Sequence, residues 1–298
     1  MSIDRLFCLL VATRGSDHSR APYLGLSQLL LLVALALPGC RDEAGSSGFS
    51  WLDSDEDSTP EDAEEDEEEE LPPIAEETLL VSFDDEMHAL LVVDPKTGEG
   101  DLAFELPDDV SSICSTVFTR DGLLYGSGGG SLYEVDPCTG ETVEVGSYPD
   151  GATICGMAAL ELEGLYGLNR GDDTLVQIDL DTAALTTVGP LGWEVGAHAL
   201  TWDRQNSRFL AIDGSENRMM AVDPKTGEST ALTSIDLDIA GVGAEKDPVT
   251  GEFYLCTGPN LYSIVVKTGE AQSIGRIGDS DSCNDLGATW IEVPCLGR

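Results

Sequence analysis

From residue 78 onward, apolar and polar residues alternate in short runs, and no run keeps the spacing of a helix. The runs "TLLVSF" (78–83), "ALLVVD" (89–94) and "DLAFEL" (101–106) follow one another at intervals of a few residues. A period of two is typical of half-buried β-strands. The pattern therefore predicts an all-β domain of short strands joined by tight turns.

One turn sequence recurs at a nearly constant spacing. "VDPKTGE" occurs at 93–99 and again at 222–228, and related turns begin at Asp136, Asp179 and Val265, so successive turns are 42, 43, 44 and 42 residues apart. Asp accepts hydrogen bonds from nearby backbone N–H groups, Pro presets φ, and Gly takes the left-handed conformation, which indicates a hairpin turn and no catalytic or metal-binding motif. A period in the forties without a helical pattern predicts the blades of a β-propeller.

The strand pattern also predicts how the ring closes. Each repeat has three strands around its turn, and most have a preceding strand rich in Gly and Ala, which suits the crowded axis of a propeller. The first repeat, beginning at Thr78, lacks this innermost strand, whereas Leu286–Val293 has its pattern but no repeat of its own. We expect the two to complete one blade of a five-bladed β-propeller closed by the C-terminal strand, with no strand edge left exposed. The stretch from Thr78 to about Pro294 resembles the quinoprotein-like and YVTN- or WD40-like propeller repeat proteins, which implies a fold and no particular activity.

The amino terminus has the pattern of an export signal. The apolar run "LGLSQLLLLVALAL" (24–37) is short for a bilayer span but suits the core of a signal peptide. Arg14 and Arg20 precede it as the positively charged side. We therefore expect a signal peptide over residues 1–39.

The "LPGC" at residues 37–40 resembles the lipobox of bacterial lipoproteins. This resemblance implies that Cys40 is the first residue of the mature chain and carries the acyl chains of a membrane anchor. Because Arg41 and not Asp follows the cysteine, the resemblance also implies the outer membrane. The alternative is a plain secretory signal with an incidental cysteine.

Charge restricts the partners and marks a linker. The 298 residues include 56 acidic and 15 basic ones, a net charge of -41, so we expect no nucleic-acid partner. Cations and basic proteins are the partners that this charge permits. Residues 40–77 hold part of the excess, and the acidic stretch Asp53–Glu70 predicts a disordered spacer ahead of a propeller at 78–298.

Six cysteines follow Cys40, and an even number in an exported domain suggests three disulfides. The blade topology places four of them on one face, at or near the innermost strands, and two on the opposite face. We expect the pairs Cys114–Cys155, Cys256–Cys283 and Cys138–Cys295. A metal cluster is the alternative, and the lack of C-x-x-C spacing speaks against it.

Several acidic residues lie in the loops that lead into the innermost strands. In a closed ring these loops converge at the mouth of the channel. These residues are Asp108, Asp109, Asp150, Glu194, Asp236, Asp238, Asp281 and Asp285. Carboxylates at one mouth can bind Ca²⁺, or act as an acid/base pair on a glycan in the manner of five-bladed glycoside hydrolases. They can also form a solvated acidic rim. Trp193, near one of these loops, is a candidate for stacking on a sugar.

The chain carries no nucleophile elbow, zinc signature or dinucleotide fingerprint, so we assign no catalytic residue and no cofactor other than the calcium that the rim would suit. The pattern favours an envelope-anchored lipoprotein whose propeller is a binding or scaffolding module for a protein, a glycan or a cation. The alternatives are a glycan-hydrolysing enzyme that uses the carboxylates at the mouth, and a purely structural envelope protein.

Overall fold

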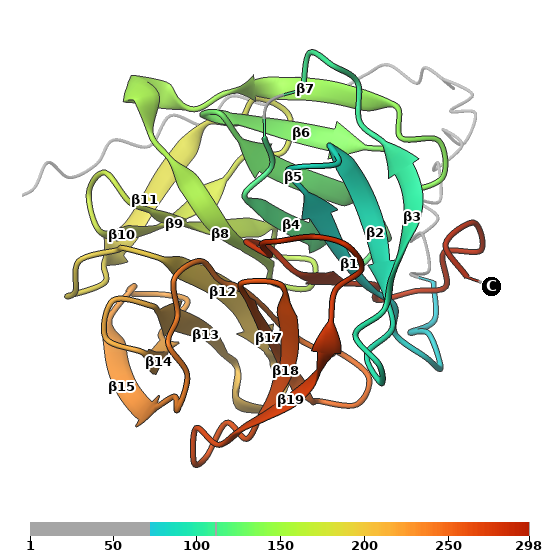
Figure 1. The fold of residues 1–298 in the computed structure, drawn as a ribbon. Helices are drawn as coiled ribbons and strands as arrows, with labels where there is room; N and C mark the ends of the chain where they lie inside the picture. Colours follow the sequence, from blue (N-terminus) through green and yellow to red (C-terminus); the bar gives the residue numbers. More distant parts are fainter. Residues whose placement is uncertain (1–71, 111, 298) are drawn as a thin grey trace, which may run out of the picture. The chain divides into compact units, whose positions relative to one another are not determined.

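The structure, a computed structural model, describes residues 72–297 except residue 111, all within the second of two compact units, Asp66–Arg298. The predicted signal peptide, Cys40 and most of the acidic linker lie outside these residues. The described part consists of twenty strands and two short 3₁₀ helices, Pro149–Gly151 and Arg204–Asn206. The strands form five four-stranded sheets around a central axis (Figure 1), which confirms the predicted five-bladed β-propeller. None of the described residues belongs to a helix that is long and apolar enough to cross a membrane.

Each blade is an antiparallel meander whose strands follow one another from the axis outward. Blade 1 contains β20 (Gly287–Ala288), β1 (Leu80–Asp84), β2 (Ala89–Val93) and β3 (Gly100–Glu105). Blade 2 contains β4 (Ser115–Phe118), β5 (Leu124–Gly128), β6 (Ser131–Val135) and β7 (Thr142–Ser147). Blade 3 contains β8 (Ile154–Ala159), β9 (Leu165–Asn169), β10 (Thr174–Ile178) and β11 (Leu185–Pro190). Blade 4 contains β12 (His198–Asp203), β13 (Arg208–Asp213), β14 (Arg218–Val222) and β15 (Ser229–Ser234). Blade 5 contains β16 (Gly243–Lys246), β17 (Phe253–Thr257), β18 (Asn260–Ile264) and β19 (Ala271–Arg276).

The carboxyl-terminal segment closes the ring as predicted. Strand β20 pairs with β1, so that Leu80 lies opposite Ala288. The pairing continues past the strand, since the Ala75 N–H donates to the Trp290 carbonyl at 2.9 Å. The strand itself is shorter than the predicted segment Leu286–Val293, because the chain turns away after Trp290 toward the disulfide at its end.

Small residues let the innermost strands approach one another at the axis. Each of β4, β8, β12, β16 and β20 lies against two of the others, which makes a closed circle. Gly243 at the start of β16 shows why side chains are excluded there, because a Cβ at this residue would lie 2.3 Å from the backbone carbonyl carbon of Asp285. The Gly- and Ala-rich segments of the sequence are therefore required by close backbone packing.

The recurrent turn has two structural roles. Its Asp caps the hairpin, because Asp94, Asp136, Asp179 and Asp223 accept backbone N–H groups two or three residues ahead at 2.7–3.2 Å. The same turn also packs against the fourth strand of the preceding blade. At Gly189 of β11, for example, a Cβ would lie 2.0 Å from the Thr226 carbonyl oxygen in the turn of blade 4. The repeat thus forms both the hairpin and the contact between blades.

The apolar core lies between neighbouring blades. Leu168 of blade 3, for instance, packs in one cluster with Phe209 and Met220 of blade 4, and five such clusters follow the ring.

Disulfides between chain segments add to this packing. The three disulfides are the pairs expected from the blade topology, with Cα–Cα distances of 5.1, 5.3 and 5.8 Å, namely Cys114–Cys155, Cys138–Cys295 and Cys256–Cys283. Disulfides are typical of proteins that fold outside the cytoplasm, so they indicate an exported protein.

Candidate functional site

The two faces of the ring carry different loops. Because neighbouring strands of a blade are antiparallel, the loops that lead into the innermost strands share one face with the turns between the second and third strands. We call this the entrance face. The loops that leave the innermost strands share the other face with the recurrent hairpin turns, and we call it the turn face. The sequence placed the candidate site on the entrance face.

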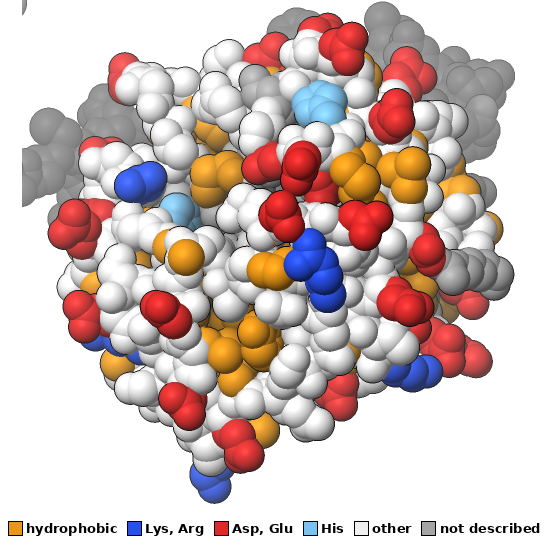
Figure 2. Space-filling model, in the orientation of Figure 1, with side chains coloured by type: hydrophobic (Ala, Val, Ile, Leu, Met, Phe, Trp, Pro, Cys, Tyr) orange, Lys and Arg blue, Asp and Glu red, His pale blue; other side chains and the backbone are white. Residues whose placement is uncertain are grey.

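The predicted acidic residues lie in the expected loops, but the structure does not assemble them into a site. Seven of them are exposed: Asp108, Asp109, Asp150, Glu194, Asp236, Asp238 and Asp281. Within residues 72–297, no three His, Cys, Asp or Glu side chains are grouped so that they could hold a metal ion. Figure 2 shows acidic side chains spread across the visible face of the domain, with few Lys or Arg side chains among them. These positions fit a solvated acidic rim better than a calcium site.

Trp193 is held by packing and by a hydrogen bond. Its indole is half-buried and packs against the apolar cluster between blades 3 and 4. Its Nε1–H donates to Ser229 Oγ at 3.3 Å. Trp193 therefore contributes to packing between blades 3 and 4, and its role in stacking on a sugar stays a prediction.

Asp285 is buried, and its carboxylate joins three segments where the ring closes. It accepts hydrogen bonds from the Phe83 N–H at 3.1 Å, from Ser82 Oγ at 3.0 Å and from Thr116 Oγ1. Burial raises the pKa of the Asp285 carboxyl to about 7, although these hydrogen bonds favour the charged form. Asp285 is thus a closure residue linking blades 1 and 2, and not the exposed rim ligand expected from the sequence.

The entrance end of the channel is almost filled. The Cys114–Cys155 disulfide, Asn284 and Asp285 contribute to its lining. The space left for the centre of a water molecule is ≈ 10 Å³. This volume suits about one water molecule.

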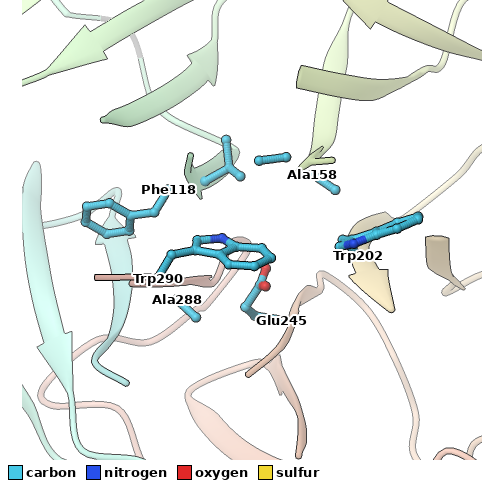
Figure 3. A pocket seen from close by; sticks show the side chains of 8 residues that line it. Phe118, Ala158, Trp202, Glu245, Ala288 and Trp290 are labelled. Carbon is cyan, nitrogen blue, oxygen red and sulfur yellow. The ribbon is translucent and has the colours of Figure 1, made fainter. Parts of the chain in front are cut away.

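The opposite end of the channel is closed by aromatic side chains around Glu245. Figure 3 shows the Glu245 carboxyl beside the Trp290 ring, with Trp202 across the cavity and Phe118 on the far side of Trp290. Glu245 accepts a hydrogen bond from Thr201 Oγ1 at 3.0 Å. Burial raises the pKa of the Glu245 carboxyl well above its ordinary value, which favours the protonated form. Here too the free space is ≈ 10 Å³.

The volumes of these two cavities limit the size of a ligand that the channel can hold. Pockets for organic ligands typically have volumes of several hundred Å³. A space for about one water molecule cannot take a sugar ring, so neither of these two cavities could hold one. Glu245 and Asp285 have the raised pKa values that catalytic acids often show, but burial at the ring axis accounts for both.

The turn face is hollowed on both sides of blade 4. The groove between blades 3 and 4 has a volume of ≈ 480 Å³ and mixes charged and apolar side chains, including Leu160, Glu163, Trp202 and Lys225. The groove between blades 4 and 5 has a volume of ≈ 380 Å³. Both grooves have the size of ligand sites, and both lie on the face that the sequence did not single out.

Blade 5 departs from the rule of the repeated turn. Its turn keeps the backbone geometry, because the Gly269 N–H donates to the Val265 carbonyl at 2.8 Å, as Gly227 donates to Asp223 at 2.9 Å. The Asp that caps the four other turns is replaced by Val265, whose side chain is 51% exposed beside the groove between blades 4 and 5. The signal was present in the sequence as "VVKTG" among "DPKTG" turns, but only the structure shows that this residue lies on a groove.

More than half of the exposed large apolar side chains lie on the same face, in loops of blades 2, 3 and 5. Among the described residues, seven large apolar side chains are exposed, and four of them lie in turn-face loops: Leu123, Leu162, Val249 and Val265. Val249 and Val265 belong to the two turn-face loops of blade 5. Exposed apolar side chains that share one face can contribute to an interaction surface.

Comparisons with known proteins support the fold and no activity. No protein-family model and no curated protein matches the chain. A chain of a nidogen/laminin complex is 11% identical, covers 73% of this chain and 100% of its own length, and superposes with a TM-score of 0.53. A protein of unknown function from Bacteroides thetaiotaomicron is 15% identical over 75% of this chain and 64% of its own, with a TM-score of 0.49. Virginiamycin B lyase from Staphylococcus aureus is 12% identical over 71% and 80% of the two chains, with a TM-score of 0.41. At such low identities the likeness is one of fold alone.

Proposed function

We propose that this protein is an envelope-anchored lipoprotein whose β-propeller is a binding or scaffolding module, and that it binds its partner through the turn face. One observation carries the proposal. The channel has room for about one water molecule at either end, whereas the turn face has two open grooves and most of the exposed large apolar side chains. A propeller with a filled axis and a hollowed face is suited to binding at its surface.

The anchoring part of the proposal rests on the amino terminus. The "LPGC" at residues 37–40 supplies the cysteine for lipid attachment, and the three disulfides agree with export. Residues 40–77 would then connect the lipid to the propeller. An acidic spacer of this kind would hold the domain away from lipid headgroups.

Charge favours a protein partner with basic residues. Between residues 72 and 297 the sequence has 39 acidic and 10 basic residues. Such a surface attracts cationic partners and repels nucleic acids and anionic lipids. Of the partners considered from the sequence, a basic protein matches both this charge and the apolar side chains on the turn face.

Anchoring is tested by growing bacteria that express the full chain with labelled palmitate. We expect label on the wild-type protein and recovery in the outer-membrane fraction. A Cys40→Ala variant should lose the label and leave the membrane fraction. Unlabelled wild-type protein would support the plain secretory signal instead.

Binding is tested by crosslinking intact cells and purifying the full chain from the envelope. We expect a defined protein partner in near-stoichiometric amount, released by high salt when crosslinking is omitted. Recovery of the chain alone under both conditions would contradict a binding role. Release of reducing sugars from envelope glycans by the purified protein would support the enzymatic alternative.

A further inference from the structure

We infer that the groove between blades 4 and 5 is the docking site for a polypeptide segment that places an aliphatic or aromatic side chain next to Lys or Arg. This inference rests on the proposed binding function, and it names the site and the chemistry of the partner. Val265 lines this groove, and Val249 is exposed in the other turn-face loop of the same blade.

The first step is the break in the repeat. In four blades the first turn residue is an Asp that accepts backbone N–H groups, as Asp223 does from Lys225 at 2.7 Å and from Thr226 at 3.1 Å. Val265 cannot accept these bonds, and it exposes an apolar side chain to solvent. Blade 5 therefore gives up a local stabilising interaction that the fold can readily provide. Such departures from local rules are typical of functional positions.

The second step is the chemistry of the groove. The apolar part of the lining comes from the exposed Val265 and the half-buried Val266, with Ile264 and Phe253 buried beneath them. Asn206 and Ser263 add hydrogen-bonding groups. A groove of ≈ 380 Å³ that is partly apolar can take one or two side chains of a partner segment. A partner with a flat surface would leave such a groove unfilled.

The third step is the charge of the groove. Lys246 is the lining cation, but its ammonium group is held by the buried carboxylate of Asp203, which also accepts a hydrogen bond from Arg208 at 3.1 Å. Glu252 lines the groove as well and accepts a hydrogen bond from Tyr254 Oη at 2.6 Å. The positive charge of the lining is thus neutralised within the protein, while a carboxylate remains at the edge. A Lys or Arg beside the apolar anchor would pair with this charge.

Charge also decides between possible occupants. A second copy of the chain would bring two strongly acidic domains together, and the acidic stretch 53–70 of the chain's own linker would be repelled in the same way. A basic segment is attracted by the whole domain before it reaches the groove. We therefore commit to a basic, apolar-anchored segment of another protein.

The test uses the full chain in detergent micelles and an array of synthetic seven-residue peptides that vary Leu, Phe, Lys, Ser and Glu. We expect peptides with both an apolar anchor and Lys to bind, and peptides lacking either to bind at least tenfold more weakly. Val265→Asp restores the residue of the other four blades. It should weaken binding at least tenfold while the melting temperature stays equal or rises, so a loss of binding cannot be ascribed to misfolding.

Matched controls separate this site from others. Leu102→Asp changes a side chain that is 58% exposed on the outer strand β3, and it should leave peptide binding unchanged. Leu162→Asp changes an exposed side chain in the loop between β8 and β9, next to Glu161 and Glu163 of the groove between blades 3 and 4, and it should also leave peptide binding unchanged. If Leu162→Asp abolishes binding and Val265→Asp does not, the inference is wrong while the proposed binding function stands.

Two further outcomes would overturn the inference. A wild-type dimer in analytical ultracentrifugation that Val265→Asp converts to a monomer would make a second copy the occupant. Failure of every peptide to bind, together with a crosslinked envelope partner that Val265→Asp does not release, would place docking elsewhere on the domain. Absence of any envelope partner would instead remove the proposed function itself.

Discussion

The α-carbon of Gly275 in β19 lies against the backbone carbonyl of Thr97 in the turn after β2. A Cβ at residue 275 would come within 1.8 Å of that oxygen. This contact joins blade 5 to blade 1, where the ring closes, and Gly189 makes the same kind of contact with Thr226 between blades 3 and 4. The Thr-Gly of the repeated turn is therefore part of the contact between blades.

Gly275→Ala should destabilise the domain by about 1–3 kcal/mol, because the added methyl must displace backbone of the neighbouring blade. The measurement is urea unfolding of the purified chain. Gly171→Ala is the matched control, because a Cβ added at this residue would lie no closer than 3.3 Å to another group, the side-chain oxygen of Asn169. Equal stability of the two variants would contradict close backbone packing at this contact.

The buried carboxyl of Asp285 predicts a pH dependence of stability. Its folded pKa of about 7 lies above the ordinary value of 3.8, so its contribution to stability is complete below pH 3.8 and is lost as the pH rises through 7. The loss is on the order of 4 kcal/mol for this group alone. Asp285→Asn cannot ionise, so its unfolding free energy should fall less than that of the wild type between pH 4 and pH 8.

Asp281→Asn serves as the control for this pH series, because Asp281 is exposed and pairs with Arg276 at the surface. It should keep the wild-type slope of stability against pH. If Asp285→Asn has that slope as well, Asp285 does not hold its proton in the folded chain, and its role at the ring closure must be revised.

The disulfide Cys138–Cys295 allows a test of the carboxyl-terminal tether. Both cysteines are exposed, so replacing both by Ala removes the cross-link without disturbing the core. The bond spans 157 residues, and a cross-link over so long a loop is expected to stabilise the domain by about 5 kcal/mol. Denaturant unfolding of the double variant should show a loss of this size, and an unchanged midpoint would show that the tail is held without the bond.

The fold could be predicted from the sequence because its determinants are local and repeated. The turn at Asp94 recurs often enough to fix the period, and the unmatched segment near Ala288 indicates how the ring closes. The disulfide pairs followed from the same topology, since the meander fixes the face on which each cysteine lies.

The site could not be predicted in the same way, because it depends on side chains that do not repeat. From the sequence, Asp285 is predicted to be an exposed carboxylate in a loop. Only the closed ring shows that it is buried between blades 1 and 2. Trp202 and Trp290 line the narrow cavity at one end of the channel. Tryptophan does not recur at the same position of each blade, so the repeat did not predict that these side chains would fill the channel. Val265 was visible as a departure from the repeat, but its position beside a groove follows from the packing of blade 4 on blade 5.

The central claim is that the protein acts through its turn face. Val249 on this face is 36% exposed and Met87 on the entrance face is 40% exposed, so the two sites differ in position more than in accessibility. A photo-crosslinking amino acid placed at either residue, followed by irradiation of intact cells, compares the faces directly. We predict a discrete crosslinked partner from residue 249 and none from residue 87. Crosslinking from residue 87 alone would contradict the claim.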